Sequence, residues 1–209
     1  ISIAEPDAGQ RELVAALDPG LVIDANNTPV AQSAAVLVLA VKPQILPEVA
    51  LALASQRRPA AQLVMSVAAG VTLRSLAGWL GTTTPLVRVM PNQPATIGAG
   101  VSALAASASV DANGRQLAGY VAGTTGRALW LQDESLMDAV TAVSGSGPAY
   151  FYLLMEHMER AATDLGLPPD LAAALTRETA LGAARVVIET QGDPAALRAA
   201  VTSPGGTTA

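Results

Sequence analysis

The chain has 209 residues, of which 51% are hydrophobic, and a mean hydropathy of +0.39, values that exclude an intrinsically disordered protein. A net charge of −5 gives no basic surface for nucleic acid, and no apolar run reaches the ~18–20 residues that span a bilayer. Cysteine is absent and His157 is the single histidine, so the sequence predicts no disulfide, no metal site and no Ser-His-Asp triad.

Residues 1–132 are predicted to form an α/β domain, because short apolar strands alternate with helical patterns at the spacing of βαβ units. Strands are predicted at 1–4, 21–23, 36–41, 63–67, 86–90, 101–104 and 128–131, with helices in most of the intervals. The run 36–41 has no polar alternation, which is typical of a strand buried on both faces of a parallel sheet. Thr28 is expected to cap a short helix at 30–34.

Residues 133–209 are predicted to form an all-α domain, because an alanine-rich helical pattern runs almost unbroken to residue 200. Helices are predicted at 134–143, 148–165, 169–190 and 194–201, and Gly166 stands where a C-terminal cap is expected. With only 3% aromatic residues, this half has little material for a core of its own. We therefore expect an intertwined homodimer, with higher assembly left open.

The chain changes character at the segment Val143-Ser144-Gly145-Ser146-Gly147-Pro148-Ala149-Tyr150, which resembles a tight turn feeding a helix. Gly145 and Gly147 are expected to take backbone angles closed to other residues, and Pro148 suits the first helical position. The segment is either a simple connection between helices or part of a site.

Ligands of parallel α/β sheets bind at the carboxyl ends of the strands, so the residues there are the first candidates. Glu5 follows the first strand, where an acidic residue can bond the adenosine ribose; the alternative is an exposed charge before Pro6. The glycine-rich phosphate loop that should precede this strand is absent from the chain. Because the chain begins at Ile1, we expect that loop and its strand to lie upstream.

Lys42 is the only lysine of the chain and follows a predicted buried strand. Such a lysine could form a Schiff base, or could simply be solvated beside Pro43. We favour an intermediate interpretation, in which the loop backbone lies against a cofactor and Lys42 supplies positive charge. His157 lies among Met and Glu residues of a helix and is interpreted as a surface or interface imidazole.

The segment 202–208 is the most informative of the chain. Gly205 and Gly206 can turn successive N–H groups toward one point, a nest suited to a carboxylate. If Thr207 and Thr208 open a helix, its N-terminus adds favourable partial charge. The alternative is a surface loop with two helix-capping threonines.

Together these motifs resemble one family, the Δ1-pyrroline-5-carboxylate reductases, over essentially the whole chain. The matching segments are Ala40-Val41-Lys42-Pro43-Gln44, Ser66-Val67-Ala68-Ala69-Gly70-Val71-Thr72, Arg88-Val89-Met90-Pro91-Asn92, Ala142-Val143-Ser144-Gly145-Ser146-Gly147-Pro148-Ala149-Tyr150 and Thr202-Ser203-Pro204-Gly205-Gly206-Thr207-Thr208.

The resemblance implies a Rossmann-type N-terminal domain, an all-helical dimerisation domain and reduction of pyrroline-5-carboxylate to L-proline by NADPH or NADH in the cytoplasm. It implies no nucleic-acid or membrane partner. The implied cofactor contacts are Asn27, Ala40, Val41, Lys42, Pro43, Val67, Ala68 and Ala69. The implied substrate contacts are Val201, Ser203, Gly205, Gly206, Thr207 and Thr208, of which Ser203 and Thr208 are the catalytic candidates, in an active site shared between subunits. Ala4-Glu5-Pro6 departs from the Ser, Asn or Arg that members commonly carry after this strand, so the choice between NADPH and NADH stays open.

Two other functions are compatible with parts of this pattern. A β-hydroxyacid dehydrogenase also joins a Rossmann half to helices, but relies on a lysine in its second half, and no lysine follows Lys42. A non-catalytic dinucleotide-binding regulator would bind NAD(P)H without turning over an imine acid, and the intact Ser203 and Thr208 argue against it.

Overall fold

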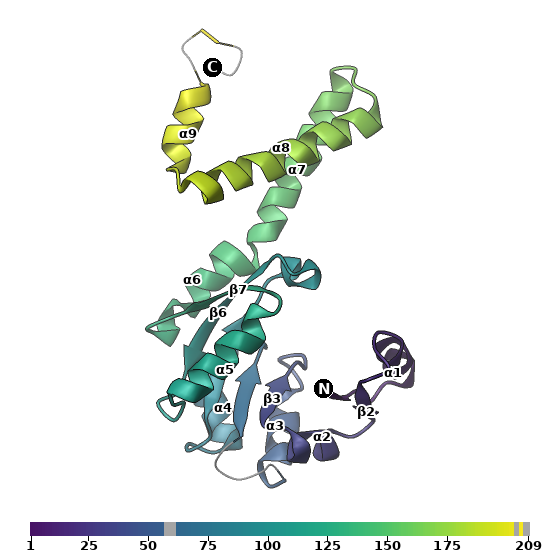
Figure 1. Ribbon diagram of the computed structural model, residues 1–209, viewed down its shortest axis with the longest axis vertical. Helices are drawn as coiled ribbons and strands as arrows, with labels where there is room; N and C mark the ends of the chain where they lie inside the picture. The colour runs from purple at the N-terminus through teal and green to yellow at the C-terminus, as the bar shows by residue number, and fades with distance from the viewer. Residues whose placement is uncertain (57–61, 203–204, 207–209) are drawn as a thin grey trace. The chain divides into compact units, whose positions relative to one another are not determined.

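The computed structural model describes residues 1–56, 62–202 and 205–206, and strands alternate with helices through most of the first 130 residues (Figure 1). The chain divides into two units, Ile1–Pro148 and Ala149–Ala209. The first is the α/β part and the second is helical, the two fold classes that the sequence predicts, while the predicted domain boundary between residues 132 and 133 stays a prediction.

Two sheets lie in the first unit. The smaller one pairs β1 (Ser2–Ala4) with β2 (Val22–Asp24) in parallel. The larger one has the order β3-β4-β5-β6-β7, formed by β3 (Val36–Leu39), β4 (Leu63–Ser66), β5 (Leu86–Met90), β6 (Gly100–Ala106) and β7 (Gly126–Trp130).

All neighbouring pairs in the larger sheet are parallel except β5 and β6. The link between these two strands holds only the short 3-10 helix η1 (Gln93–Ile97). A parallel crossover takes a dozen or more residues, so this link returns the chain antiparallel.

The helices of the first unit are α1 (Ala8–Ala15), α2 (Asn27–Ser33), α3 (Leu46–Ala54), α4 (Leu73–Leu80), α5 (Ala112–Gly123) and α6 (Met137–Val140), with the 3-10 helix η2 (Glu134–Leu136) before α6 and the π-helix η3 (Thr141–Gly145) after it. Side-chain caps begin several of them. Asp7, Thr72 and Asp111 each accept a bond from the backbone N–H three residues on, at 2.8, 3.1 and 2.7 Å.

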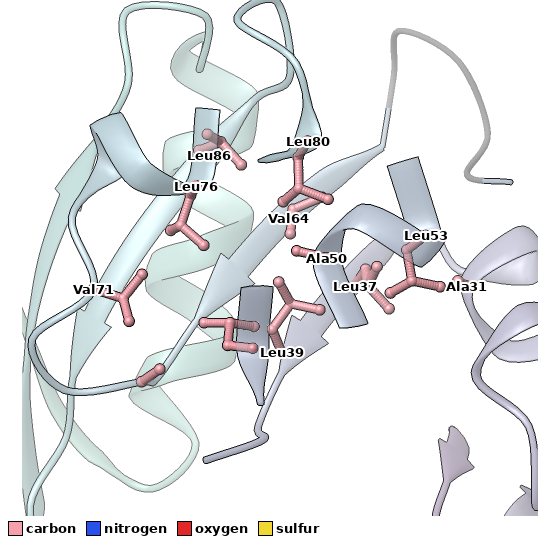
Figure 2. Packing of buried hydrophobic residues seen from close by; sticks show 12 residues of the cluster. Ala31, Leu37, Leu39, Ala50, Leu53, Val64, Val71, Leu76, Leu80 and Leu86 are labelled. Carbon is pink, nitrogen blue, oxygen red and sulfur yellow. The ribbon is translucent and has the colours of Figure 1, made fainter. Parts of the chain in front are cut away.

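Apolar side chains cover both faces of the larger sheet. On one face, residues of β3, β4 and β5 pack against α3 and α4, as Figure 2 shows for Leu39, Val64 and Leu86 among others. On the other face, residues such as Met65, Val87 and Leu104 pack against α5. Every residue of β4 is buried, so this strand has the continuous apolar character of a central parallel strand.

Two local predictions are wrong. The predicted strand 36–41 ends at Leu39 and is not buried on both faces, since Val38 is 43% exposed. The reason is its place: among the described residues β3 hydrogen-bonds only to β4, at the edge of the sheet. Thr28 does not cap α2, because that helix begins at Asn27 and the Thr28 hydroxyl instead donates to the Gln56 side chain.

The second unit contains most of α7 (Gly147–Asp164), and α8 (Pro169–Thr190) and α9 (Pro194–Val201). Gly166 has φ of 100°, which fits the predicted C-terminal cap. Many large apolar side chains of these helices are exposed, including Phe151 (62%), Leu154 (57%) and Leu181 (55%). Exposed apolar area of this extent is typical of an interaction surface. No helix within the described ranges is both long and apolar enough to cross a membrane.

Candidate functional site

The carboxyl ends of β3, β4 and β5 lie in register at one edge of the larger sheet. Leu39 pairs with Ser66, and Ser66 pairs with Arg88. The loops that follow therefore leave the sheet side by side, and the Val67 amide donates to the Leu39 carbonyl at 3.2 Å. The structure thus brings together the two loops predicted to contact the cofactor, namely Ala40, Val41, Lys42 and Pro43 after β3, and Val67, Ala68 and Ala69 after β4.

These loops are shaped by short-range bonds. The Lys42 carbonyl accepts from the amides of Ile45 and Leu46, which turns the chain into α3 while the Lys42 side chain stays exposed. After β4, the Ala68 amide donates to the Ser66 hydroxyl at 3.3 Å. Gly70 follows with φ of 76°, a conformation that favours glycine.

The predicted ribose-binding residue Glu5 and the predicted cofactor contact Asn27 follow the two strands of the smaller sheet. Ala4 pairs with Asp24, so both residues follow the carboxyl ends of a parallel strand pair. The Glu5 carboxylate accepts from the Asp7 amide at 2.9 Å, and Arg11 donates to the Glu5 carbonyl at 2.9 Å. Asn27 is exposed as the first residue of α2.

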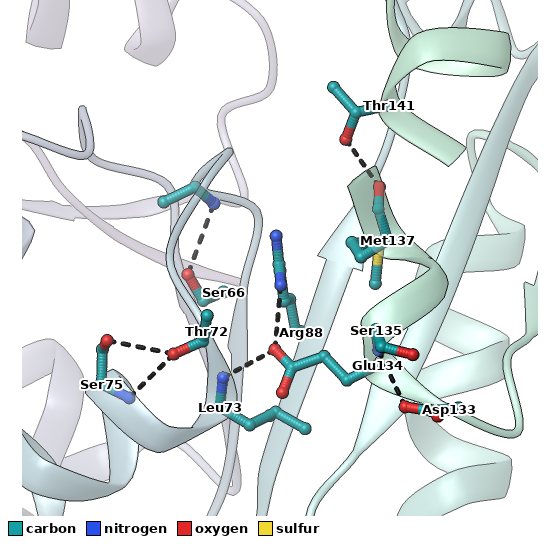
Figure 3. A network of polar contacts seen from close by, with 11 residues as sticks. Ser66, Thr72, Leu73, Ser75, Arg88, Asp133, Glu134, Ser135, Met137 and Thr141 are labelled. Carbon is teal, nitrogen blue, oxygen red and sulfur yellow. Dashed lines mark hydrogen bonds and ion pairs between the residues drawn. The ribbon is translucent and has the colours of Figure 1, made fainter. Parts of the chain in front are cut away.

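A polar network that the sequence analysis missed lies near the carboxyl edge of the larger sheet (Figure 3). Arg88, with a side chain only 5% exposed, donates to Glu134 at 2.9 Å, and the Leu73 amide at the start of α4 donates to the same carboxylate oxygen at 2.8 Å. A cleft of about 490 Å³ borders this network, lined by Gly70, Thr72, Arg74, Arg88, Asp133, Glu134, Ser135 and Asp138. The sequence did contain one sign of this network, namely an arginine inside the apolar run 86–90. A charge in a buried strand requires a partner, so an acidic residue nearby could have been expected.

Asp133 opens the short helix η2, with its carboxylate accepting from the Ser135 amide at 2.8 Å. This backbone bond, together with a side-chain bond from Ser135, lowers the pKa of Asp133 below its ordinary value of 3.8. Within the described residues, no three acidic or histidine side chains gather in a way that could hold a metal ion.

The Ser-Gly segment is not a tight turn with special backbone angles, and that prediction is wrong. Neither Gly145 nor Gly147 has a positive φ. The segment continues α6 as the π-helix η3 and then enters α7. Gly145 instead lies close to Met90: an added Cβ would lie 2.6 Å from the Met90 methyl group, which would have to move aside. Nearby, the Asn92 side-chain amide donates to the Ser144 carbonyl at 3.2 Å.

The predicted substrate segment is described only in part. Val201 ends α9 and is 67% exposed. Gly205 has φ of 73°, and Gly206 follows it in a bend. Ser203, Thr207 and Thr208 lie outside the described residues. His157 is exposed on α7, which confirms its interpretation as a surface or interface residue.

Comparison with known proteins adds the decisive observation. The family model described as pyrroline-5-carboxylate reductase dimerisation matches residues 134–209. A pyrroline-5-carboxylate reductase from Pseudomonas aeruginosa is 48% identical over 208 residues, which cover 100% of this chain and 76% of that protein. This chain belongs to the pyrroline-5-carboxylate reductase family. Solved reductases agree with it: that from Coxiella burnetii has a TM-score of 0.92 and 38% identity, covering 100% of this chain and 77% of that one. The reductase from Plasmodium falciparum, solved with NADP bound, has a TM-score of 0.83 and 28% identity, covering 90% and 71% of the two chains.

Family membership confirms two predictions made from the sequence and disfavours one alternative. The chain is an oxidoreductase that uses NAD(P)H to reduce pyrroline-5-carboxylate to proline. Its architecture is the predicted Rossmann-type α/β part followed by a helical dimerisation domain. The pyrroline-5-carboxylate reductase match extends over the whole chain, so the β-hydroxyacid dehydrogenase alternative is set aside.

Proposed function

We propose that this reductase holds the carboxylate of Δ1-pyrroline-5-carboxylate at the segment 201–208 and delivers hydride from a nicotinamide bound at the carboxyl edge of the larger sheet. The observation that carries the proposal is the register of Leu39, Ser66 and Arg88, which aligns the loops after three parallel strands at that edge. Parallel α/β sheets bind their ligands there. The proposed nicotinamide-dinucleotide contacts are the loops 40–43 and 67–69, together with Glu5 and Asn27.

The reaction adds hydride to the imine carbon and a proton to the ring nitrogen, which becomes a secondary amine. Hydride transfer needs the two reacting carbons ~3–3.5 Å apart, so positioning contributes more than acid–base chemistry. The positive φ of Gly205 supports a nest in which N–H groups of Gly205 and Gly206 converge on the substrate carboxylate. Ser203 and Thr207 complete this binding segment beside Val201.

Thr208 has the remaining role. Its hydroxyl donates a hydrogen bond to the ring nitrogen as that atom gains electron density, and solvent supplies the proton. A bond to developing charge acts mainly in the transition state, so its loss lowers the rate more than it weakens substrate binding.

The helical domain, residues 133–209 in this proposal, forms an intertwined homodimer. The exposed apolar side chains of α7 and α8 and the family's dimerisation model support it, and higher assembly is compatible with it. Besides its second copy, the reductase binds only its small-molecule ligands, and neither nucleic acid nor a membrane is a partner. It acts in the cytoplasm, the compartment of the proline-forming reaction.

Cofactor oxidation with pyrroline-5-carboxylate, followed separately for NADH and NADPH in the complete gene product, tests the proposal. A preference for NADH indicates that the Glu5 carboxylate bonds the ribose and disfavours a 2′-phosphate. Replacing Thr208→Ala should lower kcat/KM by about one to two orders of magnitude. Unchanged kinetics in that variant remove Thr208 from the mechanism, and cofactor binding without turnover by the wild type would favour the regulator instead.

A further inference from the structure

Asn92 links the end of β5 to the start of β6 and to Ser144, which lies 52 residues further along the chain. It lies two residues beyond the end of β5, and its side-chain oxygen accepts from the Val101 amide at the start of β6, at 2.9 Å. Its side-chain NH2 group donates to the Ser144 carbonyl at 3.2 Å. Both polar functions of this half-buried amide are therefore engaged in holding backbone.

The Ser144 carbonyl lacks the ordinary α-helical backbone partner. In an α-helix it would accept from the N–H four residues on, but that residue is Pro148, which has no N–H. The backbone is also π-helical here, with the Ser146 amide donating to the Thr141 carbonyl at 2.8 Å. Single π-helical turns of this kind occur frequently at functional sites.

The same two segments also fit each other sterically. The Met90 methyl group lies so near Gly145 that an added Cβ would be 2.6 Å away. The end of β5 and the segment 144–145 are thus joined by one hydrogen bond and one close apolar contact. Neither contact belongs to the residues assigned above to cofactor or substrate.

We propose that Asn92 is a positioning residue for hydride transfer, acting through the segment 144–147 that it holds against the carboxyl edge of the sheet. The inference rests on the reductase function proposed above. β5 pairs with β4, with Ser66 opposite Arg88, so Asn92 follows the strand next to the proposed cofactor loop 67–69. A misplacement of about 1 Å in such a site can lower the rate about 100-fold without any direct contact being lost.

The test uses the isosteric variant Asn92→Asp in the complete enzyme. It keeps an oxygen that accepts from the Val101 amide but places a second carboxylate oxygen against the Ser144 carbonyl. Only the hydrogen bond to Ser144 is therefore lost. We expect kcat to fall about 10- to 100-fold while KM for the imine and for the cofactor changes less than about threefold. With 4-deuterated cofactor, the isotope effect on kcat should increase, because hydride transfer becomes rate-limiting. Asn113→Asp, the same substitution at an exposed position of α5, is the matched control.

A second pair of variants distinguishes a role of Asn92 in positioning the segment 144–147 from a role limited to donating a hydrogen bond to the Ser144 carbonyl. Pro148→Ala supplies the missing N–H for the Ser144 carbonyl, so in the Asn92→Asp background, where the Val101 amide keeps its acceptor, it should raise the thermal midpoint while leaving kcat low. Recovery of kcat together with stability would overturn the proposal, as would an Asn92→Asp enzyme with unchanged kcat and isotope effect. Absence of turnover by the wild-type enzyme would instead refute the proposed function, and that result is obtained before any variant is made.

Discussion

Replacing Glu134→Ala should destabilise the first unit well beyond the loss of an ordinary ion pair. One oxygen of this carboxylate accepts two bonds, from Arg88 at 2.9 Å and from the Leu73 amide at 2.8 Å. The substitution leaves a guanidinium that is only 5% exposed without its partner, and frees an N–H at the beginning of α4.

The magnitude follows from these two losses. Removing one member of a buried ion pair costs about 3–5 kcal/mol, but Glu134 is 25% exposed and water partly replaces it, which reduces this to about 1–3 kcal/mol. The unsatisfied N–H of α4 adds about 1 kcal/mol. We expect a total of about 2–4 kcal/mol. Glu134→Gln keeps the acceptor oxygen and loses the charge, so it should cost about 1–2 kcal/mol.

Urea unfolding at one fixed protomer concentration measures these costs, provided that the slope m is unchanged. The matched control is Glu156→Ala, which removes an i,i+4 pair with Arg160 whose side chains are 62% and 60% exposed, and should cost less than about 0.5 kcal/mol beyond helix propensity. If Glu134→Ala costs no more than this control, the reasoning is refuted. The double variant Arg88→Met/Glu134→Ala should be more stable than Glu134→Ala, because no buried charge is left unpaired.

Two further predictions concern the same region. Gly145→Ala should stabilise a Met90→Ala background by about 0.5–1 kcal/mol through the better helix propensity of alanine. In the wild type this gain should be smaller or absent, because the Met90 methyl group, at the end of a flexible side chain, must move aside; urea unfolding measures both, and an equal change in the two backgrounds would contradict the steric explanation. The lowered pKa of Asp133 means that its carboxylate contributes stability above its ordinary pKa of 3.8 and loses that contribution as pH falls through the lowered folded value. The thermal midpoint of Asp133→Ala should therefore lie below that of the wild type at neutral pH and converge with it under strong acid, and parallel curves would exclude this linkage.

Elements with strong local signals could be predicted from the sequence. The helices α8 (Pro169–Thr190) and α9 (Pro194–Val201) have the predicted bounds, because prolines begin both and Asp193 caps the second through the Ala196 amide at 2.9 Å. The loops after β3 and β4, which are predicted to contact the cofactor, do lie side by side at one sheet edge, since the carboxyl ends of parallel strands meet there.

Features that depend on distant partners could not be predicted. Arg88 and Glu134 are 46 residues apart, and Asn92 and Ser144 are 52 apart, so no local pattern joins them. The π-helix was missed for a related reason. The two glycines at 145 and 147 suggested positive φ angles, which neither residue has. Gly145 instead lies close to the side chain of Met90, a residue of another element.

The alternation of side chains along β5 explains how this one strand contacts both ends of the segment 134–145. Successive side chains of a strand point to opposite faces, and Val87 and Val89 pack toward α5. On the other face, Arg88 binds Glu134 at the start of the segment 134–145 and Met90 contacts Gly145 at its end. Asn92 continues this period of two beyond the strand and binds the Ser144 carbonyl. Three residues at alternate positions thus fix both ends of one segment to the sheet edge where the proposed cofactor loops begin. A disturbance at any of them should therefore change catalysis through the geometry of that edge, even where no contact with the substrate is lost.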